Sequence, residues 1–202
     1  MDQEHLAEAL CATERYYEER AAEFDERTIG RDMAEYYEAF LPLVPKGGSI
    51  LDAGCGPGRD SLVFLQRGYV VTAFDASATA VKLASVRLGQ RVLHLSFQQV
   101  EFDHAFDGVW ACASLLHVPR AEMPDALSRL HGALKRGGVL YACVKRGTAE
   151  ELREGRLFTD YEEDSLRQVF DASGGWTIER VWPTLEVRKD RRVRWLNVLA
   201  RT

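Results

Sequence analysis

The chain has 202 residues, of which 46% are apolar and 28% charged, and its 26 Lys and Arg against 31 Asp and Glu leave a net charge of −5. This composition excludes an intrinsically disordered chain, and the length suffices for one domain that buries about 70% of its unfolded surface. No run approaches the roughly 20 apolar residues of a membrane span. The acidic first ten residues do not resemble a signal peptide, which predicts a cytoplasmic protein.

Four cysteines, Cys11, Cys55, Cys112 and Cys143, lie far apart and form no C-x-x-C pair. We therefore expect reduced thiols and no metal site. The acidic overall charge makes a nucleic-acid partner unfavourable. Charge is uneven, because residues 1–38 hold twelve acids and four Arg, whereas residues 186–201 hold six Lys and Arg and two acids. This charge pattern does not indicate an oligomeric state.

The first forty residues have helical periodicity. Apolar and aromatic residues recur at three- and four-residue intervals over 7–24 and 31–41, which predicts two helices. Prolines and a Gly-Gly pair end this segment by residue 48. We expect residues 1–45 to form a helical cap on an α/β core of residues 46–202, within a single domain.

Strand and helix patterns alternate from residue 49 onward. The predicted strands are 49–54, 69–75, 91–97, 106–113 and 138–144, and the predicted helices between them are 61–67, 78–88 and 124–136. The strands are nearly continuously apolar, as in a parallel sheet that is covered on both faces. The alternation predicts a doubly wound α/β domain.

The C-terminal region breaks this rhythm. A helix over 161–175 precedes two strand patterns, 176–187 and 192–200, joined by the charged turn RKDR. We expect an antiparallel hairpin at one edge of the sheet. The complete prediction is a seven-stranded, mainly parallel sheet with helices on both faces.

A glycine-rich loop follows the first strand in the sequence LDAGCGPGRDS, with glycines at 54, 56 and 58. Glycine allows a sharp turn and close approach of the backbone to a ligand, and N–H groups at a helix start favour anionic groups. Asp75 ends the second strand, where a carboxylate can accept hydrogen bonds from ribose hydroxyls. The two features predict a nucleoside-containing cofactor at the carboxyl edge of the sheet.

The loop departs from the dinucleotide fingerprint G-x-G-x-x-G, which requires glycine where this chain has Arg59. Instead, LDAGCGPG resembles motif I of the class I S-adenosylmethionine-dependent methyltransferases. FDGVWACASLLHV and LKRGGVLYACVK resemble the motif IV and fifth-strand regions of that family. GCGPGRDSLVFLQRGYVVTAFDAS and WLNVLAR resemble its tellurite-resistance (TehB-like) branch and uncharacterised bacterial relatives.

The resemblance implies a Rossmann-like methyltransferase fold, S-adenosyl-L-methionine as cofactor and S-adenosyl-L-homocysteine as product. The cofactor-binding residues that it implies are Asp52, Gly54, Cys55, Gly56, Gly58, Asp75, Ala76, Phe97, Gln98 and Ala113. In this assignment Asp52 orders the loop, whose backbone contacts the methionine portion of the cofactor. Asp75 holds the ribose, and Phe97 and Gln98 replace an aspartate that the family commonly places near the adenine amine.

The acceptor site has fewer sequence signals. Methyl transfer from a sulfonium depends on alignment and exclusion of water, and a base is needed only when the acceptor must lose a proton. His117 follows the fourth strand, where it would be a base, an orienter of substrate, or a loop histidine bonded to a backbone carbonyl. Tyr16 and Tyr17 lie on the predicted cap, and because adjacent residues cannot share a helix face, at most one should line the pocket.

Arg188 belongs to an arginine cluster with Arg191, Arg192 and Arg194 at the hairpin turn. A solvated turn and an anion-recognition patch for an acidic acceptor both fit this pattern. The sequence as a whole predicts a methyltransferase for a small-molecule acceptor. The alternatives are a tRNA or protein methyltransferase, a non-catalytic S-adenosylmethionine-binding protein and, least favoured, a dehydrogenase.

Overall fold

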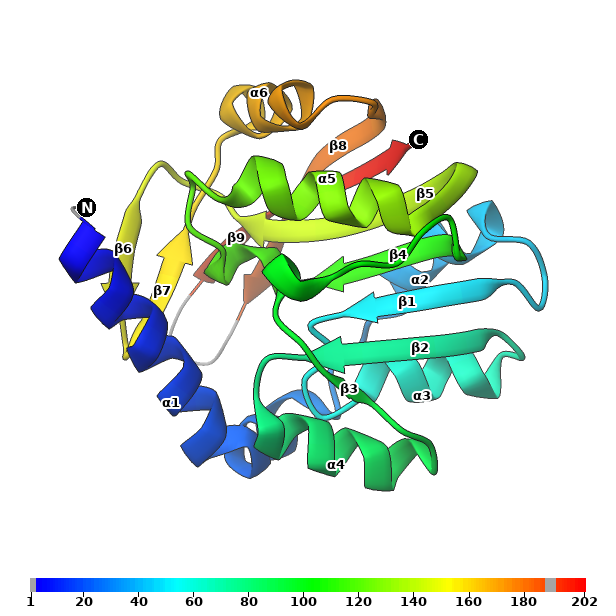
Figure 1. The fold of residues 1–202 in the computed structure, drawn as a ribbon, viewed down its shortest axis with the longest axis horizontal. Helices are drawn as coiled ribbons and strands as arrows, with labels where there is room; N and C mark the ends of the chain where they lie inside the picture. Colours follow the sequence, from blue (N-terminus) through cyan, green and yellow to red (C-terminus); the bar gives the residue numbers. More distant parts are fainter. Residues whose placement is uncertain (1–2, 188–191) are drawn as a thin grey trace.

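A computed structural model describes residues 3–187 and 192–202 (Figure 1). The helices are α1 (Gln3–Thr28), α2 (Ala34–Phe40), α3 (Arg59–Gln66), α4 (Ala78–Leu88), α5 (Met123–Ala133) and α6 (Glu163–Ser173), with short 3-10 helices η1 (Leu41–Leu43), η2 (Phe97–Gln99) and η3 (Leu115–His117). The strands are β1 (Ser49–Ala53), β2 (Val70–Asp75), β3 (Leu93–His94), β4 (Phe106–Cys112), β5 (Leu134–Lys145), β6 (Glu150–Arg153), β7 (Arg156–Thr159), β8 (Thr177–Val187) and β9 (Arg192–Arg201).

Seven strands form one sheet in the order β3-β2-β1-β4-β5-β9-β8. The pairs from β3 to β5 are parallel, and β9 is antiparallel to both of its neighbours, β5 and β8. The predicted seven-stranded sheet and its C-terminal hairpin are confirmed. Consecutive parallel strands are joined through helices, as expected for a doubly wound domain.

Each face of the sheet carries its own core. On β4, Val109 and Ala111 pack in the cluster that includes α5 and α6, whereas Trp110 points to the opposite face and packs with α2 and α3. Side chains of successive strand residues point to opposite faces, so an uninterrupted apolar strand supplies both cores. This arrangement explains the nearly continuous apolar runs of the sequence.

One predicted strand is shorter in the structure, and one sheet was not predicted. The run 91–97 forms only the two-residue edge strand β3, because the Gln99 side chain accepts a hydrogen bond from the Ser96 N–H and the chain turns into η2. The second sheet, the β6–β7 hairpin, was not predicted. Glu154 and Gly155 occupy its turn with φ of 51° and 76°, the backbone of a tight hairpin turn.

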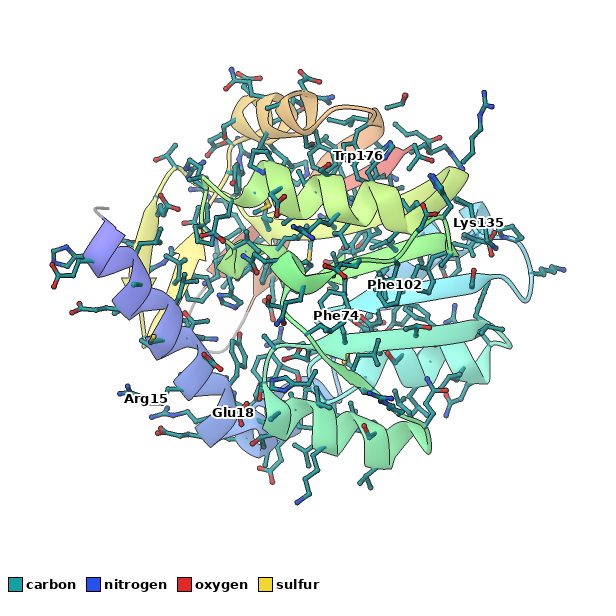
Figure 2. All side chains as sticks on the ribbon, in the orientation of Figure 1. Arg15, Glu18, Phe74, Phe102, Lys135 and Trp176 are labelled. Carbon is teal, nitrogen blue, oxygen red and sulfur yellow. The ribbon has the colours of Figure 1, made fainter. Side chains whose placement is uncertain are left out.

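Helix α1 crosses the carboxyl edge of the sheet and contacts α4 and β7 (Figures 1 and 2). The Glu18 carboxylate accepts hydrogen bonds from the Thr79 N–H and hydroxyl at 3.1 and 2.7 Å, at the start of α4. At the other end, the Leu157 N–H donates to the Thr13 hydroxyl at 2.7 Å. These contacts hold α1 over the edge where the glycine loop lies. No helix in the described parts of the chain combines the length and the apolarity needed to cross a membrane.

Candidate active site

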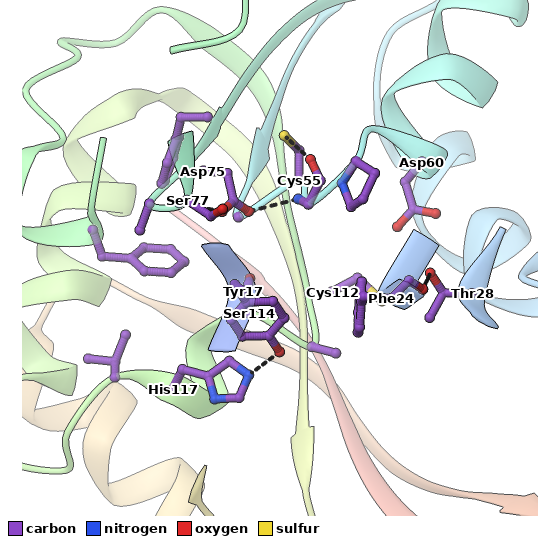
Figure 3. Close-up of a pocket in the computed structure, with 18 of the residues that line it drawn as sticks. Tyr17, Phe24, Thr28, Cys55, Asp60, Asp75, Ser77, Cys112, Ser114 and His117 are labelled. Carbon is purple, nitrogen blue, oxygen red and sulfur yellow. Dashed lines mark hydrogen bonds between the residues drawn. The ribbon is translucent and has the colours of Figure 1, made fainter. Parts of the chain in front are cut away.

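A cavity of about 760 Å³, called here the central cavity, opens at the carboxyl ends of β1, β2 and β4 beneath α1 (Figure 3). This volume lies within the range of about 300–1,000 Å³ that is usual for small-molecule sites. Predicted residues in its lining are Tyr17, Gly54, Cys55, Gly56, Asp75, Ala76, Phe97, Gln98, Ala113 and His117. The fold therefore gathers most of the sequence-predicted site around one space.

The glycine loop is held close to the end of β4. Gly54 has a φ of +77°, and a Cβ there would lie 2.4 Å from the Ser114 Cβ, so a larger residue does not fit. The Ser114 hydroxyl donates to the Ala53 carbonyl at 2.6 Å, which fixes the two strand ends together. The cavity lies against this loop, whose backbone a ligand can approach without side-chain obstruction.

Asp75 fixes the other side of the loop. Its carboxylate accepts hydrogen bonds from the Gly56 N–H at 2.8 Å and from the Ser77 N–H at 2.9 Å. Burial raises the pKa of Asp75, and the two N–H donors oppose that rise. Because each carboxylate oxygen has two acceptor sites, Asp75 can accept further bonds from a pair of ligand hydroxyls in the cavity. These residues fit the ribose of a nucleoside cofactor.

Asp52 and Gly58 lie outside the cavity lining. The Ser61 hydroxyl donates to the Asp52 carboxyl group at 2.6 Å beneath the loop, and burial raises the pKa of Asp52 to about 8. Gly58 has a φ of +86°, and a Cβ there would lie 3.2 Å from the Ala84 Cβ. Both residues support the loop from below and do not face a ligand.

Asp60 is a site residue that the sequence reasoning missed. This buried carboxylate accepts hydrogen bonds from the Tyr37 hydroxyl at 2.6 Å and the Trp110 Nε1 at 2.8 Å. Arg59 donates to both of its oxygens at 2.7 and 2.9 Å. Burial opposes ionisation, but Arg59 and the other donors hold the pKa of Asp60 below its ordinary value. The sequence signal for this cluster is the pair Arg59 and Asp60 directly after the glycine loop, because charged side chains at a buried helix start need partners.

At the opposite end of the cavity lie Phe97 and Gln98. The Phe97 ring packs edge-on against Phe74 at 5.4 Å between centroids. The Gln98 amide donates to the Glu122 carboxylate at 2.6 Å. This end therefore offers an aromatic surface beside polar groups, which fits a flat heteroaromatic ring such as adenine.

Tyr17 and His117, one hundred residues apart in the sequence, meet over the cavity (Figure 3). His117 Nδ1 lies 2.6 Å from the Leu157 carbonyl, which can only accept, so Nδ1 carries the proton. Nε2 then accepts from the Tyr17 hydroxyl at 2.8 Å. Burial lowers the pKa of His117 to about 3, and the charges of Arg156 and Lys145 act in the same direction. His117 is a neutral ring with both nitrogens occupied.

The remaining predicted acceptor residues lie elsewhere. Tyr16 does not line the cavity and packs beneath the Arg156 guanidinium, 4.2 Å from the ring centroid. Adjacent positions on α1 thus place one tyrosine in the cavity and the other against β7. Arg188 and Arg191 lie outside the described residues. Unpredicted lining comes from β5 and β9, through Cys143, Trp195 and Asn197 among others.

Residues 50–138 match the family described as a methyltransferase domain. This match spans 89 of the 202 residues, and over that stretch the chain is similar to methyltransferase domains. It is 34% identical over 109 residues to the malonyl-[acyl-carrier protein] O-methyltransferase of Salmonella typhimurium, a match covering 52% of this chain and 43% of that protein. The enzyme of the same name from Buchnera aphidicola is 28% identical over 85% of this chain and 68% of its own length. The chain therefore matches about half of the length of the Salmonella relative.

Among solved structures, the chain is similar to the Burkholderia thailandensis 1,6-didemethyltoxoflavin-N1-methyltransferase with bound 1,6-didemethyltoxoflavin and S-adenosylhomocysteine. The TM-score is 0.77 at 22% identity, over 100% of this chain and 91% of that one. This likeness confirms the Rossmann-like methyltransferase fold. The match to a methyltransferase domain and the fold both agree with the cofactor that the glycine loop and Asp75 predict.

Proposed function

We propose that this chain transfers a methyl group from S-adenosylmethionine to a small molecule whose nucleophilic atom is already ionised. The observation that carries the proposal is one continuous cavity. It runs from the glycine loop and Asp75, past Ala113, to the Tyr17–His117 pair. A cofactor site thus opens directly onto a second, partly polar region that is covered by α1.

The residues that would hold the cofactor are the backbone of the 54–56 loop, the Asp75 carboxylate at the ribose and Phe97 at the adenine. When bound, the cofactor supplies an electrophilic methyl group on sulfur. Ala113 and Ser114, at the end of β4, face the same space. The chain's own contribution is alignment of the acceptor and exclusion of water by α1.

The Tyr17–His117 pair favours an orienting role over that of a base. Protonation of His117 would create an imidazolium in a buried place beside the positive charges of Arg156 and Lys145. The same surroundings favour an anion in the cavity. An acceptor that arrives as a carboxylate or thiolate needs no base, so we assign Tyr17 and His117 to positioning it.

The names of the matched relatives support a carboxylate acceptor. The Salmonella and Buchnera proteins are named O-methyltransferases of malonyl groups on acyl-carrier protein. Because of this likeness and the positive charges near His117, we propose that the acceptor of this chain is an acid. We also propose that the chain is related to the TehB-like branch, that it is located in the cytoplasm and that it forms a single domain.

Calorimetry with the full chain tests the cofactor. We expect S-adenosylmethionine and S-adenosylhomocysteine to bind, and NAD and NADP to give no heat. Tight nicotinamide binding without any response to S-adenosylhomocysteine would contradict the methyltransferase function. A release assay for S-adenosylhomocysteine, run over small carboxylic acids, thiols and phenols, then tests the acceptor class. Turnover of phenols alone would contradict a pre-ionised acceptor.

A further inference from the structure

A second cavity, of about 310 Å³, lies at the end of β5 and is called here the basic cavity. Five of its lining residues are cationic and two are acidic: Lys145, Arg146, Arg153, Arg192 and Arg194 against Glu154 and Asp160. It draws on β5, the β6–β7 hairpin and the start of β9, which are distant in sequence. The fold thus concentrates positive charge that the sequence spreads over fifty residues.

Ion pairs neutralise only part of this charge. Arg153 pairs with Asp160, and Arg146 pairs with Glu162 at 2.8 Å. Arg192 and Arg194 are exposed and form no ion pair with any residue over 3–187 or 192–202. Guanidinium groups bind carboxylates and phosphates through charge-assisted, often bidentate hydrogen bonds. The cavity therefore has donors in place for an anion.

The basic cavity adjoins the acceptor end of the central cavity. Phe158 lines the basic cavity, and its ring packs against His117 at 5.0 Å between centroids. The Lys145 ammonium also lies 3.3 Å from the Phe158 ring centroid. The two cavities share this Phe158–His117 contact as a wall.

Strand β9 connects the cavities as well. Trp195 lines the central cavity, where its Nε1 donates to the Glu186 carboxylate at 3.1 Å, while Arg194 lines the basic cavity. Side chains of neighbouring strand residues point to opposite sides. One strand end thus presents an aromatic ring to the acceptor space and a guanidinium to the adjacent basic space.

We infer that the basic cavity binds an anionic group, a carboxylate or phosphate, on the methyl acceptor at a distance from the atom that is methylated. This inference rests on the proposed function. The basic cavity, of about 310 Å³, is large enough for one small charged group. The cofactor-binding loop lines the central cavity and not the basic cavity. Arg192 and Arg194 select acceptors that carry such a group, and Phe158 separates it from the Tyr17–His117 pair.

Inorganic phosphate is the first probe, titrated by calorimetry into the full chain saturated with S-adenosylhomocysteine. The variant is the double replacement Arg192→Ala with Arg194→Ala. The matched control is Arg129→Ala with Arg167→Ala, which removes two charges paired within their own helices. We expect phosphate affinity to fall at least about tenfold in the cavity variant, and to remain within about twofold in the control. Equal phosphate affinity in wild type and cavity variant would overturn the inference.

Turnover measurements test whether the basic cavity binds the acceptor. Matched acceptors, one with a remote carboxylate and one with the neutral amide in its place, are compared by kcat/KM. Wild type should prefer the carboxylate, the cavity variant should lose that preference about tenfold through KM, and phosphate should compete with the carboxylate acceptor. If S-adenosylhomocysteine binds but both acceptors are used equally by all proteins, the inference fails while the methyltransferase function stands. Failure to bind S-adenosylhomocysteine would instead remove the proposed function.

Discussion

Replacement of Asp75 by Asn tests the cofactor site most directly. The Asp75 oxygens accept from Gly56 and Ser77, and the variant exchanges one acceptor oxygen for an NH₂ group that cannot accept. A hydrogen bond to a charged group contributes about 1.5–3 kcal/mol, and about 1.4 kcal/mol corresponds to a tenfold change in affinity. We expect the dissociation constant of S-adenosylhomocysteine, measured by calorimetry, to rise roughly tenfold to a hundredfold, with a native circular dichroism spectrum.

Loop disorder could produce the same loss, so the ligand is varied together with the protein. An S-adenosylhomocysteine analogue without the 2′ and 3′ ribose hydroxyls should bind wild type and Asp75→Asn with affinities that differ by only about twofold. The two perturbations are then coupled, as in a double-mutant cycle. Equal losses for both ligands would show that Asp75 only orders the 54–56 loop and would refute the ribose contact.

Three further predictions concern the surrounding residues. Tyr17→Phe removes the hydroxyl that donates to His117 Nε2, and it should lower kcat about tenfold while cofactor affinity stays within about twofold. Tyr16→Phe, at a position outside the cavity, is the control. Equal losses of kcat in the two variants would contradict a positioning role for Tyr17. Burial lowers the pKa of His117 in the folded chain to about 3, so between about pH 6.5 and pH 3 the imidazole is protonated in the unfolded chain only. The free energy of unfolding, measured by chemical denaturation, should therefore fall by up to about 1.4 kcal/mol for each unit of acidification. The slope should be shallower in His117→Gln. Asp60→Ala should reduce the free energy of unfolding in urea by about 3–5 kcal/mol, since it leaves the partly buried Arg59 unpaired; a loss no larger than that of Trp110→Phe would contradict this.

The sequence predicts the sheet well because most of its strands are apolar and several are preceded by glycine. Predictions fail where short-range side-chain chemistry decides the backbone. Ser96 and Gln99 cap η2 and shorten the strand expected over 91–97. The β6–β7 hairpin turns through Glu154 and Gly155, and glutamate is an unusual residue at a positive φ, so the turn carries no recognisable signal.

The cofactor side of the site is equally readable from sequence, since the loop and Asp75 follow directly from adjacent parallel strands. The acceptor side is not. The contact between Tyr17 and His117 depends on how α1 lies across the sheet, and the Leu157 carbonyl that fixes the His117 tautomer belongs to the unpredicted hairpin. Tertiary packing decides all three positions, and no local pattern encodes it.

Part of the uneven charge of the sequence lies in the lining of the two cavities. The central cavity is lined by six acidic residues and two arginines among the described residues, and the basic cavity by five cations and two acids. Methyl transfer from a sulfonium to a carboxylate consumes one positive and one negative charge and leaves a neutral thioether and a neutral ester. The acidic lining of the central cavity therefore favours the cationic sulfonium and holds the neutral thioether less strongly, whereas the remote anionic group in the basic cavity keeps its charge through the reaction. The charge separation that the fold builds thus promotes the encounter of donor with acceptor, and the loss of the sulfonium charge promotes release of S-adenosylhomocysteine.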